Sequence, residues 1–455
     1  MPLPDDPPVV YADYQQIGAE WLASQKRALL ADGLGLGKTA TAIHASDLVE
    51  SNHTLVVAPL SLLGQWNSEI VRFCKRPETV WHLCNYERLT KEPYASMKPD
   101  LVIVDEAVAM KNPKAKRTQA FSALAGRCKY LFMLTGTPIR NHPADMAILF
   151  LSIENDSNKP ILNLTRAYWN WIRTYFITEQ VVWPTGYTSI EIKEVMPYMR
   201  TKFDAMVDEY ILRRDKSILG LAPLSSEEVV LDWTDETQRQ TYEDLFEEFV
   251  LRQAEDEDQK LNVATDLLAR LMRLRQVALD PALCEAPGGS VKTAWLMDFV
   301  NLHATDHRIL VFTSFREWIT SYSDEFGKYE PILFHGGLDG VRREVFLDQW
   351  HKDDRHRVMF LTPGAGGVGL NLQEADIVVH LDLPWTPDML EQATARAYRR
   401  GQTKQVHEVL LLMRDSIDLE MLAVLRAKER VANQTLAASK VWERLKSRAK
   451  GEDPQ

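Results

Sequence analysis

Asp32–Thr39 reads Asp-Gly-Leu-Gly-Leu-Gly-Lys-Thr, so that Gly33, Gly35 and Gly37 alternate with apolar residues before a lysine and a threonine. Glycines let backbone N–H groups curl around a polyphosphate because no Cβ stands in the way. A helix expected over residues 40–45 would point its positive N-terminal end at the anion. Lys38 would reach the β- and γ-phosphates, and the Thr39 hydroxyl would ligate Mg²⁺. The generic pattern has glycine where this chain has Asp32, and a glycine-rich turn without a ligand is the alternative interpretation.

The bulk composition is that of a soluble globular protein, with room for two or three domains in 455 residues. The formal net charge of −11 argues against a nonspecific basic coat for nucleic acid, but it is compatible with a local basic groove. Four scattered cysteines indicate neither a zinc site nor a disulfide framework, which fits a reducing cytosol. The proline-rich residues 1–10 are unlike a signal peptide, and no apolar run is long enough to span a membrane.

Six short apolar runs end in polar, glycine or proline residues, which is typical of buried parallel strands. They are Leu55–Ala58, Leu101–Val104, Leu131–Leu134, Ile309–Phe312, Val358–Leu361 and Ile377–Leu381. Helical stretches lie between them, and Trp21–Leu30, just before the glycine-rich stretch, is also expected to be helical. Strand–helix alternation in both halves of the chain predicts an α/β protein with two doubly wound parallel-sheet lobes.

The middle and the end of the chain have a different character. Aromatic residues are frequent from Trp169 to Tyr187, and core packing is expected for most of them. Gln238–Leu274 is typical of one or two long charged helices. The piece from Leu419 is expected to be helical and becomes basic, which suits either phosphate contact or a solubilising tail. Its basic residues are Arg426, Lys428, Arg430, Lys440, Arg444, Lys446, Arg448 and Lys450.

Two polar motifs follow predicted strands of the first half. Asp105-Glu106 comes directly after Leu101–Val104, at the strand edge where α/β sheets bind ligands. Asp105 can hold Mg²⁺ and Glu106 can polarise an attacking water. Thr135-Gly136-Thr137-Pro138 follows the next strand and either senses the γ-phosphate or forms an ordinary turn.

Three side chains of the second half, Gln392, Arg396 and Arg399, are spaced for one face of a helix. Two guanidinium groups on one face suit the charge that develops on a γ-phosphate in a transition state. A surface arginine helix that pairs with acidic neighbours is the alternative interpretation. If these arginines come from the second lobe, hydrolysis requires closure of the two lobes.

These motifs, in this order, resemble the Swi/Snf-type ATPases of helicase superfamily two over about residues 14–420. The most family-specific runs are Gly-Gly-x-Gly-x-Asn-Leu from Gly366 and Gln-Ala-x-x-Arg-x-x-Arg-x-Gly-Gln from Gln392. Weaker signatures are Tyr14–Leu22, Pro59–Trp66, Asn85–Glu87, Leu212–Arg214, Leu274–Pro281, His335–Arg343 and Asp382–Pro387. Within that family, the chain resembles compact viral or bacterial members.

The resemblance implies two RecA-like lobes with helical protrusions, and ATP-driven translocation along double-stranded DNA with hydrolysis at the cleft between the lobes. The implied domains are an ATP-binding lobe with a helical protrusion (1–215), a helical protrusion and linker (216–289), and a helicase lobe with a basic C-terminal helix (290–455). One chain holds both halves of the site, so a monomer suffices. The expected location is the cytoplasm, or the host cytoplasm for a viral protein.

The resemblance also implies residue roles. The implied catalytic residues are Lys38, Glu106, Arg396 and Arg399. ATP contacts are assigned to Gln15, Gly33, Gly35, Gly37, Lys38, Thr39, Gly367 and Gln392. Mg²⁺ would be held by Thr39 and Asp105, and Thr135 and Thr137 would couple hydrolysis to movement. DNA contacts are assigned to Ser61, Asn85, Thr313, Gly366, Asn371 and Trp385.

One departure from the family pattern bears on function: Val108 stands where a histidine is usual, and valine cannot donate a hydrogen bond to Thr135 or Gln392. Two other functions are kept open beside the translocase, and the valine favours only the second of them. One is a strand-separating helicase, which would use exposed aromatic side chains to stack bases. The other is a nucleotide-binding scaffold without hydrolysis.

Overall fold

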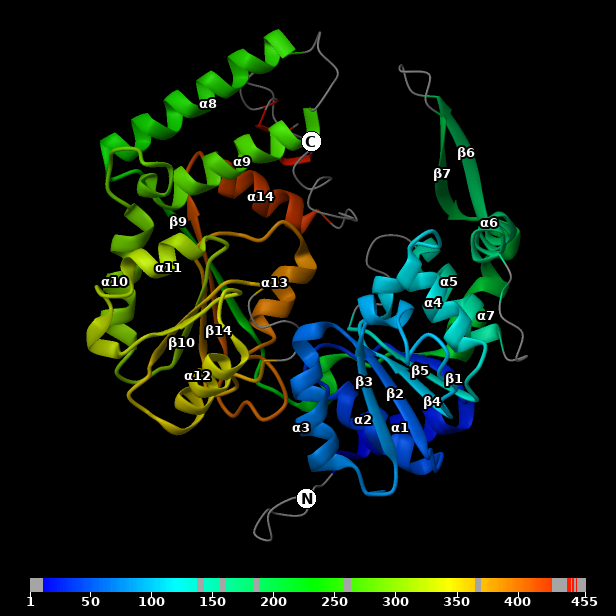
Figure 1. Cartoon of the computed structure of the whole chain (residues 1–455). Coiled ribbons are helices and arrows are strands. Elements are labelled where there is room, and N and C mark those ends of the chain that lie inside the picture. Colours follow the sequence, from blue (N-terminus) through cyan, green and yellow to red (C-terminus); the bar gives the residue numbers. More distant parts are fainter. Residues whose placement is uncertain are drawn as a thin grey trace. The chain divides into compact units, whose positions relative to one another are not determined.

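The computed structural model describes residues 11–136, 143–155, 161, 163–182, 188–256, 263–364, 370–427, 440–442, 444–445 and 447 (Figure 1). The chain divides into two compact units, Met1–Leu219 and Gly220–Gln455. The three-part division expected from the sequence stays a prediction. Among the described residues, every helix is too short or too polar to cross a membrane.

Unit 1 is built on a six-stranded parallel sheet in the order β3-β2-β4-β5-β1-β8. Its strands are β1 (Arg27–Leu30), β2 (His53–Ala58), β3 (Val80–Asn85), β4 (Leu101–Val104), β5 (Tyr130–Leu134) and β8 (Ile211–Leu212). The helices beside the sheet are α1 (Asp13–Gln25), α2 (Lys38–Leu48), α3 (Leu63–Phe73), α4 (Lys116–Ala125) and α5 (Ala147–Glu154). The central strands are apolar throughout because helices cover both faces of such a sheet.

The expected helix over Trp21–Leu30 is wrong in its last part. Helix α1 ends at Gln25, Lys26 adopts a left-handed φ of 65°, and β1 begins at Arg27. Arg27 is only 4% exposed, and its guanidinium donates to the carbonyl oxygens of Ala125, Cys128, Ser152 and Ile153. The sequence did not reveal this strand because it begins with a charged residue and only Lys26 separates it from α1.

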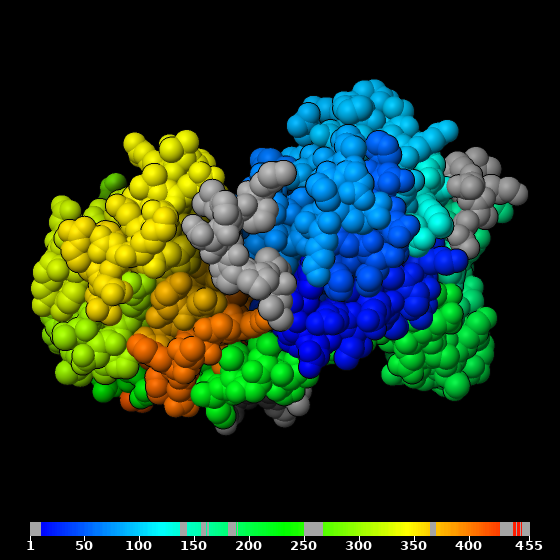
Figure 2. All heavy atoms as spheres, turned by 90° about the horizontal axis from the view of Figure 1, so that it is seen from below, coloured from blue at the N-terminus to red at the C-terminus, as the bar shows by residue number. Residues whose placement is uncertain are grey.

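An insertion separates β5 from β8 in unit 1. It contains α6 (Leu164–Tyr175), the antiparallel hairpin β6 (Phe176–Val182) and β7 (Thr188–Val195), and α7 (Arg200–Tyr210). The hairpin projects away from the sheet in Figure 1, and the insertion forms the green surface at the right edge in Figure 2. Trp171, Tyr175 and Phe176 pack in the core beside Phe150, as expected. Trp183 and Tyr187 lie outside the described residues.

Unit 2 has a second six-stranded parallel sheet, in the order β11-β12-β10-β13-β14-β9. Its strands are β9 (Ser225–Leu231), β10 (Ile309–Phe312), β11 (Ile332–Phe334), β12 (Val358–Leu361), β13 (Ile377–His380) and β14 (His407–Met413). Its helices are α8 (Glu236–Asp256), α9 (Val263–Leu279), α10 (Val291–His303), α11 (Arg316–Tyr322), α12 (Gly340–Lys352), α13 (Pro387–Thr394) and α14 (Ile417–Arg426). The two lobes and all six predicted strands are therefore confirmed, as are the long helices α8 and α9.

The C-terminal piece is described only in part. Helix α14 confirms helical structure near Leu419 and packs in one hydrophobic cluster with α9 and Trp442. Arg444 donates to Glu420 at 3.0 Å, so this basic side chain serves an internal contact. Some of the basic residues of this piece lie outside the described residues, namely Lys428, Arg430, Lys446, Arg448 and Lys450.

A polar network with a buried centre joins β9, β13, β14 and α13 in unit 2. The Glu408 carboxylate accepts hydrogen bonds from Ser226, at 2.7 Å, and from Thr394. The His380 ring lies 3.6 Å from Glu408 and 3.2 Å from the Thr394 hydroxyl. Burial by itself raises the pKa of Glu408, but the bonds and charge of His380, with Thr394 and Ser226, outweigh it and lower the pKa to about 2.

We expect Glu408→Gln to flatten the pH dependence of stability in acid. A carboxyl group whose pKa is lower in the folded than in the unfolded state contributes stability above its unfolded pKa of about 4.3. That contribution is lost as pH falls through the folded value of about 2. Urea unfolding at several pH values between 2 and 5 measures the slope, and an identical slope in the two proteins would contradict this account.

Candidate nucleotide-binding site

The glycine-rich loop of unit 1 joins β1 to α2 at the carboxyl edge of the sheet. Gly35 and Gly37 have φ angles of 88° and 77°, a region that side chains other than glycine rarely adopt. A Cβ on Gly37 would also stand 2.4 Å from Nε2 of Gln15. The loop therefore requires glycine at both positions, and α2 begins at Lys38 with its N-terminal N–H groups directed toward the loop.

Lys38 is held against the beginning of the loop. Its ammonium donates to the carbonyl oxygen of Asp32 at 2.8 Å and approaches that of Gly33 at 3.4 Å. The ammonium also acts electrostatically on the Asp105 carboxyl, at the end of β4. The structure thus brings the predicted phosphate-binding lysine close to the predicted Mg²⁺ ligand, although they are 67 residues apart in the sequence.

Asp105 is positioned by two donors. Trp66 Nε1–H donates to Oδ2 and the Glu106 N–H donates to Oδ1, each at 3.0 Å. The Tyr86 hydroxyl donates to the carbonyl oxygen of Asp105, and Glu106 is held in a left-handed conformation at φ 50°. Burial raises the pKa of the Asp105 carboxyl, although Trp66, Lys38 and the Glu106 N–H favour its ionised form. A bound cation would oppose the cost of burial in the same way.

The predicted Mg²⁺ ligands fit a magnesium ion by their chemistry. Mg²⁺ prefers oxygen donors and takes one or two protein ligands, with phosphate and water completing its shell. Asp105 offers a buried carboxylate and Thr39 offers a hydroxyl in the first turn of α2. No group of three or more His, Cys, Asp or Glu residues suited to a metal exists among the described residues. A metal here would therefore depend on the nucleotide for part of its coordination.

Thr135 and Gly136 lie beside the glycine-rich loop. The Thr135 N–H continues the sheet by donating to the Leu30 carbonyl at 3.1 Å, and its side chain is fully buried. A Cβ on Gly136 would come within 2.5 Å of Leu34 and 3.6 Å of Lys38 Nζ. This close approach gives a physical reason for glycine in the motif. Thr137 lies outside the described residues.

Gln15 and Val108 both face the interior. Gln15 is 1% exposed, accepts the Ala12 N–H at 3.0 Å and donates to the Leu36 carbonyl at 3.2 Å. The amide that the resemblance assigns to adenine thus also holds the glycine-rich loop. Val108 is 7% exposed and packs in the hydrophobic core of unit 1, where its side chain serves packing.

Arg396 and Arg399 do not lie on a helix, which corrects the sequence prediction. Helix α13 ends at Thr394, and the chain continues in tight turns in which Arg396 N–H donates to the Ala393 carbonyl and Ala397 N–H to the Thr394 carbonyl. Such hydrogen bonds, from the N–H of residue i to the carbonyl of residue i−3, commonly satisfy the last carbonyl groups of a helix. Arg396 is buried, and half-buried Arg399 donates to the Leu370 carbonyl at 2.9 Å. Gln392, also half-buried, stays on α13.

The residues assigned to DNA occupy varied environments. Ser61 and Asn371 are exposed, and half-buried Asn85 ends β3 and accepts the Arg88 N–H at 3.1 Å. Thr313 is fully buried after β10 and Trp385 is 5% exposed. Gly366 and Gly367 lie outside the described residues. The DNA contacts therefore stay predictions.

Arg275 has no role among the sequence-based predictions, but the structure shows it to be a central contact at the carboxyl edge of the second sheet. Arg275, on α9, is 1% exposed and donates to Asp382 at 2.6 Å and to Ser314 at 3.0 Å. Its guanidinium also lies 4.8 Å from the centre of the Trp385 ring. A buried arginine must find acceptors inside the fold, but the sequence does not show which ones.

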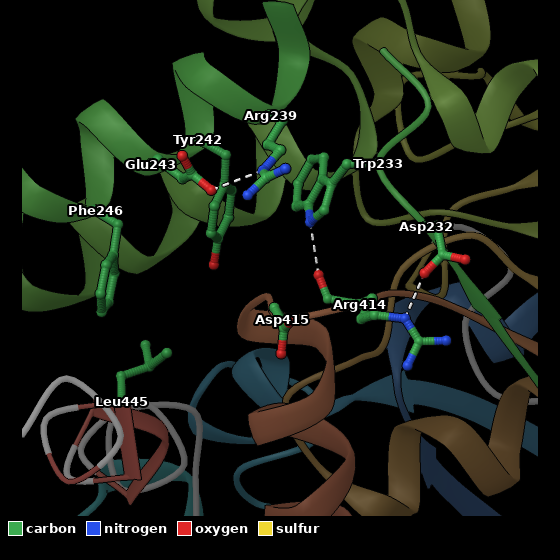
Figure 3. Close-up of a pocket in the computed structure, with 9 residues that line it drawn as sticks. All are labelled: Asp232, Trp233, Arg239, Tyr242, Glu243, Phe246, Arg414, Asp415 and Leu445. Carbon is green, nitrogen blue, oxygen red and sulfur yellow. Dashed lines mark hydrogen bonds and ion pairs between the residues drawn. The ribbon is translucent and has the colours of Figure 1, made fainter. Parts of the chain in front are cut away.

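A pocket of about 430 Å³ also lies in unit 2, at the carboxyl ends of β9 and β14 (Figure 3). Its charged groups largely pair with one another, because Arg414 binds Asp232 and Arg239 lies 2.9 Å from Glu243. The Trp233 indole donates to the Arg414 carbonyl at 2.7 Å. None of the nucleotide-site residues predicted from the sequence lines it. Its lining residues are Asp232, Trp233, Arg239, Tyr242, Glu243, Phe246, Arg414, Asp415 and Leu445.

Two parallel-sheet lobes, with a phosphate-type loop and a strand-end Asp-Glu pair in the first, define the class of helicase-like nucleotide-binding proteins. The SNF2-related domain matches residues 14–92 and 82–283, and the helicase conserved C-terminal domain matches residues 291–401. The chain belongs to the SNF2-related family.

Named relatives agree with this assignment. The chain is 25% identical over 463 residues to an uncharacterized ATP-dependent helicase of Mycoplasma pneumoniae, covering 93% of this chain and 42% of the relative. It is 25% identical over 483 residues to the transcription regulatory protein SNF2 of Saccharomyces cerevisiae, covering 94% and 28%. The chain thus spans less than half the length of these relatives. A solved structure, the Sulfolobus solfataricus SWI2/SNF2 ATPase core in complex with dsDNA, is 23% identical with a TM-score of 0.42, covering 96% of this chain and 94% of that one.

Proposed function

We propose that this chain hydrolyses ATP and uses the free energy to translocate along double-stranded DNA. The observation that carries the proposal is the arrangement at the loop of unit 1. There the Lys38 ammonium donates a hydrogen bond to the Asp32 carbonyl of the loop, and it interacts electrostatically with the buried Asp105 carboxyl. A cation beside a cradle of N–H groups binds phosphate, and a carboxylate nearby holds the Mg²⁺ that phosphoryl transfer requires.

In the proposed mechanism the residues of the chain bind, orient and polarise. Lys38 and the loop N–H groups orient the phosphates, and Thr39 and Asp105 would hold Mg²⁺, which would supply positive charge beside them. Glu106, fixed next to Asp105 by its left-handed backbone, orients and polarises the attacking water. Arg396 and Arg399 supply positive charge where the transferred phosphoryl group becomes more negative.

DNA is the proposed activator because the chain belongs to the SNF2-related family and its relatives are named ATP-dependent helicases and a transcription regulatory protein. We expect phosphate release to rise when duplex DNA is added. We also expect the half-saturating DNA concentration to increase steeply with salt, because phosphate contacts release counterions. Phosphate release measured with duplex, single-stranded and no DNA, at several salt concentrations, checks both. Equal rates with and without duplex would contradict the proposal.

Displacement of a third strand from a DNA triplex then tests movement. A motor that moves along duplex without opening it displaces the third strand but leaves a labelled fork intact. Efficient fork unwinding would instead indicate a strand-separating helicase. That alternative would have to use aromatic side chains other than the buried Trp171, Tyr175 and Phe176, such as Tyr198, which is 78% exposed. DNA-independent nucleotide binding without hydrolysis would indicate the scaffold.

A further inference from the structure

Asp32 occupies the position where the generic phosphate loop has glycine, and its side chain is fully buried. A buried carboxylate is costly unless it is paired and hydrogen-bonded. Arg214 provides the partner, because its Nε donates to Oδ1 at 2.9 Å and its Nη2 donates to Oδ2. This two-pronged contact fixes the orientation of both groups, which a single lysine ammonium could not do.

The same guanidinium also holds helix α1. Its Nη1 donates to the carbonyl oxygen of Tyr14, and its central carbon lies 5.4 Å from the centre of the Tyr14 ring. A Cβ on Gly18 would come within 2.5 Å of Nη2, so glycine there leaves space for the arginine. Arg214 therefore joins α1 to the phosphate loop through one rigid group.

The backbone around Arg214 continues the sheet into the loop. The Ala31 N–H donates to the Leu212 carbonyl at 2.7 Å, and the Gly33 N–H donates to the Arg214 carbonyl at 2.9 Å. These bonds extend the parallel pairing of β1 with β8 beyond both strand ends. Because β8 begins at Ile211, directly after α7, the segment that returns from the insertion forms one wall of the phosphate loop.

Arg214 contacts Asp32 and Tyr14, and the positions of two predicted nucleotide-binding side chains depend on these two residues. The Asp32 carbonyl is the closer acceptor for Lys38 Nζ, at 2.8 Å. Gln15 follows Tyr14 on α1 and donates to the loop at Leu36. A shift of Asp32 or of Tyr14 would therefore change the positions of the lysine and the glutamine relative to each other.

We propose that Arg214 is a positioning residue for the nucleotide, acting through Asp32 and Tyr14 to set the phosphate loop against α1. The inference rests on the proposed function only in taking a nucleotide as the ligand of the loop. It explains why this loop has an aspartate where glycine would satisfy the phosphate: the carboxylate serves the arginine and not the ligand. The hydrolysing groups themselves, Glu106 and Arg399, are not part of this contact.

The test is direct calorimetric titration of the full chain with Mg²⁺ and ADP, with thermal unfolding measured in parallel. We expect Arg214→Lys and Asp32→Gly each to weaken ADP binding by roughly ten- to a hundredfold, the range for loss of a charge-assisted hydrogen bond. The double variant should be little worse than either single variant, because both changes remove the same contact. The matched control is Arg213→Lys, since Arg213 is the adjacent, exposed arginine and should leave ADP affinity unchanged.

The outcomes are distinguishable. A lower melting temperature with unchanged ADP affinity would show a purely structural pair and overturn the proposal, as would full affinity in Asp32→Gly. If the single variants do not fold, the neutral pair Asp32→Asn with Arg214→Gln leaves no unpaired charge and takes their place. Unchanged ADP affinity in that pair would overturn the proposal. Failure of the unchanged chain to bind ADP would instead refute the proposed function.

Discussion

Lys38→Ala is expected to abolish ATP turnover while the fold persists. Removing one preorganised positive group from a phosphoryl-transfer site costs on the order of 10²–10³ in rate, and loss of ground-state phosphate contacts adds to this. Lys38 is half-buried at the beginning of α2, so its removal exposes the loop carbonyls of Asp32 and Gly33 to water and creates no cavity in the core. Steady-state phosphate release with duplex DNA present measures the loss, and circular dichroism and thermal unfolding measure the fold.

The matched control for Lys38→Ala is Lys129→Ala. Lys129 is exposed and directly precedes β5, at the opposite edge of the same sheet from the glycine-rich loop. We expect turnover in the control to equal that of the unchanged chain. Residual turnover in Lys38→Ala within a few-fold of the control would mean that the loop is not the site of hydrolysis, whatever else it binds.

Much of the fold was predictable because its signals are local. Runs such as Leu101–Val104 are short and apolar at every position, which is the pattern expected of a strand covered on both faces. The glycines of the phosphate loop were predictable for a related reason. Gly35 and Gly37 adopt a positive φ, which glycine accommodates far more easily than other residues, so glycine at these positions indicates the turn.

What the sequence could not show depends on contacts between distant residues. Strand β1 follows α1 after a single residue and begins with Arg27, which is buried because carbonyl groups between Ala125 and Ile153 accept its hydrogen bonds. The end of α13 at Thr394 was hidden because the residues that follow, Ala395 to Ala397, favour a helix. These turns also form hydrogen bonds with distant segments, such as the bond from the Leu372 N–H to the Arg396 carbonyl. A local sequence pattern cannot predict such bonds.

The site shows the same limit. Asp105 and Lys38 could be placed together from their strand-end positions, since such ends meet at one edge of a sheet. The side chains that orient Asp105 could not be identified from the sequence, because Trp66 and Tyr86 come from other elements. The one available signal was Asp32: an acidic residue at a glycine position of an interior loop demands a cation, although its spacing does not identify Arg214.

Arg399→Ala is expected to reduce the catalytic rate far more than it reduces nucleotide affinity. An arginine that meets the γ-phosphate mainly in the transition state is worth roughly 10³–10⁵ in rate, or about 4–7 kcal/mol. Arg399 follows a tight turn and donates to the Leu370 carbonyl at 2.9 Å, and this hydrogen bond orients its guanidinium. Single-turnover hydrolysis and calorimetric titration with a non-hydrolysable ATP analogue, which keeps the γ-phosphate that ADP lacks, separate the two effects.

Two variants sharpen the test of Arg399. Arg399→Lys keeps the positive charge but loses the planar fork, and we expect it to recover only a small part of the rate because a point charge cannot bridge two phosphate oxygens. Arg400→Ala removes the adjacent, exposed arginine and should leave the rate close to that of the unchanged chain. A rate in Arg399→Ala equal to that in Arg400→Ala would remove Arg399 from the chemistry. A loss of affinity for the non-hydrolysable ATP analogue that matches the loss of rate would assign Arg399 to ground-state binding, because only a group that acts more strongly in the transition state lowers the rate by itself.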